Sequence, residues 1–175
     1  MRDDLVIRRE RPGDALPTEL LHDAAFPVPA GCGESLERRL VRGLRADGAV
    51  IDGLTFVAEL EGEVVGHVVC SRARLGEEPS VGLGPLAVRP DHQRQGIGAA
   101  LVMAVVASAE RVGEPAVVLL GDPDYYGFFG FVPASRHGII APGPWAQAFQ
   151  VLTLRAWRPQ LAGDFRYAAD FDQLL

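Results

Sequence analysis

The sequence predicts an α/β fold built around one mixed β-sheet. Segments with helical spacing come early, β-rich runs follow, and a strand–helix–strand unit covers residues 81–120 before the last extended runs. The 175 residues are about the size of one domain, and 48% of them are hydrophobic, enough to bury a core without disulfides or metal. We therefore expect a single domain over residues 1–175.

The first half of the chain is predicted to hold a strand, two helices and a hairpin. A short alternation that starts at Leu5 indicates a strand, and leucines at helical spacing follow the break at Pro12. A loop rich in Pro and Gly leads to Ser35, which begins a more polar helix, and two β-rich runs then flank a turn at Gly62. The predicted segments are a strand at 5–9, a helix at 16–24, a loop at 26–33, a helix at 35–47, and antiparallel strands at 54–61 and 64–71.

The second half is predicted to contain further strands around one long apolar helix. That helix follows a Gly-rich turn, and a later loop rich in Pro and Gly is of the kind that often carries binding specificity. The predicted segments are a strand at 81–88, the helix at 98–111, a strand at 116–120, a short helix at 125–129, an extended piece at 131–133, a loop at 136–147 and a strand at 149–157.

Composition and charge exclude several classes of protein. The formal net charge is −6 without any run of Lys or Arg, which argues against nucleic acid and suits an amine-bearing substrate. The longest apolar stretch, 97–109, is shorter than the roughly 20 residues of a membrane span, and the N-terminus lacks the apolar stretch of a signal peptide. Cys32 and Cys70 are far apart, and no metal-ligand spacing occurs. We expect a cytoplasmic protein that binds no membrane, no nucleic acid and no metal.

The segment that points to chemistry is Gln-Arg-Gln-Gly-Ile-Gly at residues 93–98, between a strand and a helix. Gly96 and Gly98 remove side chains where the helix begins, so that free backbone N–H groups and the helix dipole can face a phosphate. A dinucleotide fingerprint would need a third glycine where Leu101 stands, and the Gly-Lys-Ser/Thr of a P-loop is absent. Because glycines also mark ordinary turns, the residues alone leave a phosphate loop and a structural turn both open.

This segment resembles the Q/R-x-x-G-x-G/A pyrophosphate loop of the GNAT superfamily of N-acetyltransferases. Residues 126–131, Tyr-Gly-Phe-Phe-Gly-Phe, are similar to the family's Tyr-x-x-x-Gly-Phe element, and the preceding Gly-Asp-Pro-Asp-Tyr-Tyr is similar to one bacterial branch. The two motifs occur in the family's order within residues 81–131. The resemblance implies the GNAT fold, a central and mostly antiparallel sheet flanked by helices, and acetyl-CoA as acyl donor.

The same resemblance implies a cofactor site on the strand and the loop that follows it. The strand backbone would bind the pantetheine arm like an added strand, and the loop N–H groups would hold the pyrophosphate, with the charge of Arg94 added. Gly84-Pro85 is expected to mark the bulge that family members carry in this strand. The implied cofactor-binding residues are Leu86, Ala87, Val88, Arg94, Gln95, Gly96, Ile97, Gly98 and Ala99.

Tyr126 is the candidate catalytic residue. Read without the family, Tyr126 is an aromatic packing residue beside several phenylalanines; the resemblance implies instead a general acid that protonates the departing thiolate. No general base is assigned, because the strand at 81–88 has no carboxylate where many relatives place one, and a water relay is the expectation. His67 is interpreted as structural, His92 as solvent-facing, and Cys70 as a buried hydrophobe rather than a nucleophile.

The resemblance thus implies an N-acetyltransferase that transfers acetyl from acetyl-CoA to a primary amine by direct attack in a ternary complex. Two alternatives stay open: a non-catalytic acyl-CoA-binding or sensing module, and a structural α/β interaction domain whose Gly-x-Gly is a turn. The acceptor is not identified by the sequence. An apolar last strand at 149–157, followed by Phe165, Tyr167 and Phe171, predicts self-association, as in a homodimer.

Overall fold

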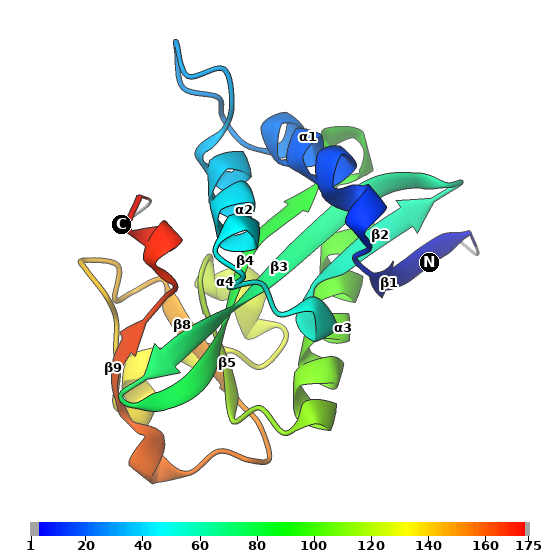
Figure 1. The fold of residues 1–175 in the computed structure, drawn as a ribbon. Helices are drawn as coiled ribbons and strands as arrows, with labels where there is room; N and C mark the ends of the chain where they lie inside the picture. Colours follow the sequence, from blue (N-terminus) through cyan, green and yellow to red (C-terminus); the bar gives the residue numbers. More distant parts are fainter. Residues whose placement is uncertain (1–3, 174–175) are drawn as a thin grey trace.

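The computed structural model describes residues 4–173 and contains a mixed sheet flanked by helices (Figure 1). The helices are α1 (Ala15–Ala25), α2 (Leu36–Ala46), α3 (Ile97–Val112) and the short α4 (Pro123–Gly127). The strands are β1 (Leu5–Arg9), β2 (Phe56–Leu60), β3 (Glu63–Leu75), β4 (Glu78–Val88), β5 (Ala116–Leu120), β6 (Val132–Pro133), β7 (Ile139–Ile140), β8 (Phe149–Thr153) and β9 (Gly163–Arg166). Within residues 4–173 there is no helix long and apolar enough to cross a membrane.

The strands lie in the order β1-β2-β3-β4-β5-β8-β6, and β9 pairs with the end of β3 and with β7. Neighbouring strands run antiparallel except for two pairs, β4 with β5 and β7 with β9. The predicted fold class, a mixed and mostly antiparallel sheet, is confirmed.

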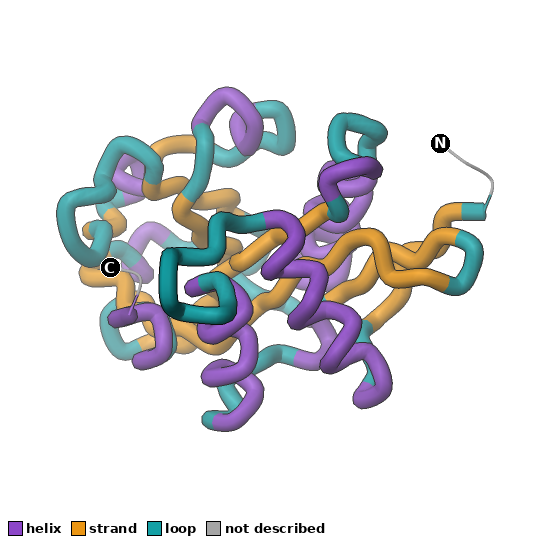
Figure 2. Tube along the Cα trace, turned by 90° about the horizontal axis from the view of Figure 1, so that it is seen from above, coloured by secondary structure: helices purple, strands orange, loops and turns teal. Residues whose placement is uncertain are grey.

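Helices cover both faces of the sheet (Figure 2). On β3, the side chain of His67 contacts α1, whereas a Cβ on the adjacent Gly66 would lie 2.9 Å from Ile97 Cγ2 of α3. Because neighbouring residues of a strand point to opposite faces, α1 and α3 lie on opposite sides. Val69, two residues beyond His67, packs with the buried face of α2, so α2 shares the face of α1. The missing side chain at Gly66 lets α3 approach the sheet closely.

A bulge and a divergence of strands open the middle of the sheet. Val68 pairs with Leu86 and Cys70 with Leu83, so one residue of β3 faces Gly84 and Pro85 of β4. The predicted bulge is therefore present. The parallel register of β4 with β5 ends at Gly82↔Val118, and beyond it the two strands separate.

Several details differ from the sequence-based expectation. β3 and β4 are longer than predicted and meet at a tight turn, and β7 and β9 were not predicted. β8 ends at Thr153, and a turn closed by a hydrogen bond from the Trp157 N–H to the Leu154 carbonyl follows.

Self-association was predicted from an apolar last strand beside a sheet edge, and this reason was wrong. β8 is paired on both sides, with β5 and β6, so it is no open edge. The C-terminal aromatic residues pack inside their own chain: Phe165 is 2% and Phe171 8% exposed, and the Tyr167 and Phe171 rings stack at 4.2 Å. A homodimer stays a prediction without this support.

Candidate active site

The loop before α3 presents free backbone donors. The first hydrogen bond of the helix runs from the Ala100 N–H to the Gly96 carbonyl at 3.0 Å. The N–H groups of Ile97, Gly98 and Ala99 precede this bond and have no acceptor within the helix. Gly96 has φ 85°, a conformation that favours glycine, and the helix dipole adds positive potential at this end. The arrangement suits an anion such as a pyrophosphate.

Side chains of the loop hold its shape. The Gln93 amide donates to the Val88 carbonyl at 3.0 Å, and the Gln95 amide donates to the Asp91 carbonyl at 3.1 Å. Arg94 is exposed and has φ 57°. The loop is thus fastened to the end of β4, and the Arg94 charge remains at the surface.

A pocket of about 280 Å³ lies at this loop, and six of the nine predicted cofactor-binding residues line it: Leu86, Val88, Arg94, Gly96, Gly98 and Ala99. The other three do not: Ala87 and Ile97 are buried in the core, and Gln95 lies in the loop outside the lining. The Tyr125 hydroxyl closes one side, since a Cβ on Gly98 would lie 2.8 Å from it.

The backbone beside this pocket can accept another strand. From Leu83 to Val88, β4 pairs with β3 on one side, while its register with β5 has ended on the other. Backbone groups on that open edge are available to a linear chain that carries amides.

A second pocket, of about 430 Å³, lies on the other side of Leu86, which lines both cavities. Tyr126 is part of its wall, and within residues 4–173 no group hydrogen-bonds the Tyr126 hydroxyl. Burial, with a smaller contribution from Tyr125, raises the pKa of this phenol above its ordinary value, so it stays protonated at neutral pH. The two adjacent tyrosines therefore face different cavities.

Among the lining residues of the second pocket that the sequence reasoning missed are Phe26, Glu37 and Trp145. They come from the loop after α1, from α2 and from the loop before β8, and no local pattern connects these segments. The Pro- and Gly-rich composition around Trp145 was the one signal available.

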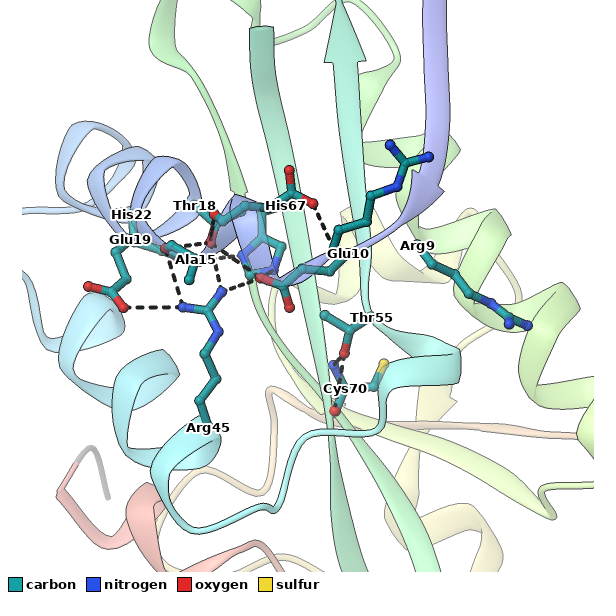
Figure 3. A network of polar contacts seen from close by, with 12 residues as sticks. Arg9, Glu10, Ala15, Thr18, Glu19, His22, Arg45, Thr55, His67 and Cys70 are labelled. Atoms are coloured by element: carbon teal, nitrogen blue, oxygen red, sulfur yellow. Dashed lines mark hydrogen bonds and ion pairs between the residues drawn. The ribbon is translucent and has the colours of Figure 1, made fainter. Parts of the chain in front are cut away.

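A buried polar network fastens α1 and α2 to β3 behind this pocket (Figure 3). His22 Nε2 and His67 Nδ1 lie 3.0 Å apart, and His67 Nε2 is 3.5 Å from a Glu10 oxygen, which also pairs with Arg45 of α2. Burial lowers the pKa of both histidines, so they are neutral at pH 7. Phe26 stacks on His22 with ring centroids 5.9 Å apart, which links the network to the pocket wall.

The remaining candidates take structural positions. His67 is fully buried in the network just described, in keeping with the structural interpretation. Cys70 is fully buried, and burial raises the pKa of its thiol, which disfavours a nucleophile. His92 was expected to face solvent, but it is half-buried, with Nδ1 2.8 Å from Asp91 Oδ1. Among the described residues, no group of three or more His, Cys, Asp or Glu is placed to hold a metal ion.

Comparison with known proteins agrees with this geometry. The model of the acetyltransferase (GNAT) family matches residues 20–129. The uncharacterized N-acetyltransferase YhbS of Escherichia coli K12 is 37% identical over 150 residues, covering 84% of this chain and 86% of the relative.

Two solved structures are also similar. The E. coli YhbS crystal structure in complex with CoA has a TM-score of 0.85 at 34% identity and covers 97% of this chain and 92% of that one. A GNAT family acetyltransferase from Brucella melitensis in complex with acetyl-CoA has a TM-score of 0.79 at 35% identity and covers 98% of this chain and 100% of that one. The family match over more than half of the chain, together with these relatives, shows that the chain belongs to the acetyltransferase (GNAT) family.

Proposed function

We propose that the protein transfers the acetyl group of acetyl-CoA to a primary amine by direct attack within a ternary complex. The observation that carries this proposal is the pair of pockets that meet at Leu86, one at a phosphate-binding loop and the other beside Tyr126. A donor and an acceptor bound in these pockets would meet at the open edge of β4.

In this proposal the pyrophosphate of acetyl-CoA binds the N–H groups at the start of α3, and Arg94 adds its charge. The pantetheine amides pair with the backbone at Leu86, Ala87 and Val88. Two relatives were solved in complex with CoA and with acetyl-CoA, which supports acetyl-CoA as the donor of this chain.

The reaction forms one N–C bond and breaks one C–S bond. The neutral amine attacks the thioester carbonyl, and the tetrahedral intermediate collapses with release of the CoA thiolate. Tyr126 donates its proton to that thiolate, and the proton lost by the amine nitrogen returns to the phenolate through water. We assign this transfer to a water relay, because the open part of β4 after the bulge carries no carboxylate.

Steady-state kinetics tests the ternary complex. With both substrates varied, intersecting double-reciprocal lines are expected. Parallel lines would indicate an acyl-enzyme, which the burial of Cys70 argues against. CoA binding without release of free thiol for any amine would favour the non-catalytic module.

A further inference from the structure

The wall of the second pocket is chemically uneven. Apolar and aromatic side chains reach it from four separate parts of the chain, among them Phe26, Leu40, Trp145 and Phe171. Trp145 is 45% exposed, which places it at the rim. A cavity of about 430 Å³ with such walls fits a small molecule with a compact apolar or aromatic body.

Glu37 places a charge in this largely apolar and aromatic wall. Of the described residues that line this pocket, Glu37 alone is charged. Its position on α2 follows from helical spacing, which puts it on the same face as Leu36 and Leu40.

The carboxylates around Glu37 already have cationic partners. Glu34 pairs with arginines of α2, including Arg42 at 2.7 Å, and Asp23 pairs with Arg38 at 2.6 Å. Within residues 4–173, Glu37 takes part in no ion pair. A half-buried carboxylate in an apolar wall and without an ion-pair partner among the described residues is suited to a cation brought by the ligand.

The geometry points to an acceptor of defined chemistry, and this inference rests on the transferase activity proposed above. The acceptor is a primary amine on an aromatic or branched aliphatic body. Glu37 binds its ammonium group while the body packs against the apolar wall that includes Phe26 and Trp145, and the ammonium then releases a proton to water before the neutral amine attacks. The acyl chain of a longer acyl-CoA would fit the apolar walls equally well. It carries no cation, however, and would leave Glu37 facing an apolar group, so the pocket favours the amine.

The test compares phenethylamine and isoamylamine with ethanolamine and putrescine as acceptors of acetyl-CoA. The apolar amines should have kcat/KM at least tenfold above the polar ones. In Glu37→Gln, the KM for phenethylamine should rise about tenfold to a hundredfold, with kcat and the KM for acetyl-CoA nearly unchanged. The matched control is Glu77→Gln, which removes the same charge from the 87% exposed Glu77 side chain on the turn between β3 and β4 and should leave these constants unchanged.

Other outcomes would overturn the inference and leave the transferase activity standing. The first is an equal kcat/KM for ethanolamine and phenethylamine, and the second is an unchanged KM for phenethylamine in Glu37→Gln. The third is a Trp145→Ala variant in which the preference for butyryl-CoA over acetyl-CoA changes but the KM for amines does not.

If no amine is acetylated although CoA binds, the proposed function fails, and calorimetric titration of phenethylamine into the CoA complex then tests the pocket alone. A Kd for phenethylamine that rises about tenfold to a hundredfold in Glu37→Gln supports the assigned ligand chemistry. No binding overturns it.

Discussion

Replacement of Tyr126 by phenylalanine separates chemistry from packing. The ring stays against Phe131, with centroids 5.8 Å apart, and within residues 4–173 no hydrogen bond is lost, because no group bonds the hydroxyl. Stability should therefore change by less than about 0.5 kcal/mol. What the variant loses is the proton donor in the wall of the second pocket.

The expected kinetic effect is large. Loss of a general acid usually costs about 10²-fold or more in kcat, which corresponds to about 2.7 kcal/mol of transition-state stabilisation. The burial that raises the pKa of Tyr126 also strengthens a hydrogen bond to a developing thiolate, because water does not compete. The Kd for acetyl-CoA should change little.

Tyr125→Phe is the matched control. The Tyr125 hydroxyl lies at Gly98 in the pocket before α3, where we propose that the pyrophosphate binds, so its loss should alter acetyl-CoA affinity and leave kcat close to wild type. Release of free thiol, followed with a chromogenic disulfide, gives kcat for both variants, and calorimetry gives the Kd. Near-wild-type kcat in Tyr126→Phe would refute the role of general acid, and a large loss in Tyr125→Phe alone would move that role to Tyr125.

Three further predictions concern the loop, the histidine network and the thiols. Gly98→Val should fold, as circular dichroism would verify, but bind CoA at least tenfold more weakly, because its side chain enters the pocket to which we assign the pyrophosphate. Unchanged affinity would contradict this assignment. The unfolded chain takes up protons near pH 6.5 while the buried histidines stay neutral, so the free energy of unfolding should fall as the pH decreases below about 6.5. His22→Leu should weaken this dependence of the unfolding free energy on pH, and it should destabilise the protein by about 1–3 kcal/mol in urea unfolding, because it leaves His67 without a hydrogen bond. An unchanged pH dependence would mean that His22 does not contribute to it. Under native conditions the exposed Cys32 should react quickly with a thiol reagent and the buried Cys70 only on unfolding, so two rapidly reacting thiols would contradict the packing.

The Gly-rich loop before α3 could be predicted from the sequence because its determinants are local. Gly96 and Gly98 stand at fixed positions at the start of one helix, and the bulge at Gly84-Pro85 is likewise marked by its own residues. Helix α3 was predicted to within one residue at each end for the same reason, since the apolar stretch 97–109 marks its body and Gly113 its C-terminal end.

The second pocket could not be predicted, because its walls come together only in the folded chain. Glu37 looks like any solvent-facing residue of a polar helix until α2 is packed on the sheet. The far part of β3 was overlooked although Ala73 and Leu75 are buried and alternate with exposed Arg72 and Arg74, a period typical of a strand with one buried face. β9 is short and depends on its partner strands rather than on its own sequence.

A crystal structure of the protein with CoA tests the central claim most directly. We expect the pyrophosphate on the N–H groups of Ile97, Gly98 and Ala99, the pantetheine arm along Leu86, and the sulfur within about 3.5 Å of the Tyr126 hydroxyl. A pyrophosphate bound elsewhere, or a sulfur that lies away from the junction of the two pockets, would contradict this account.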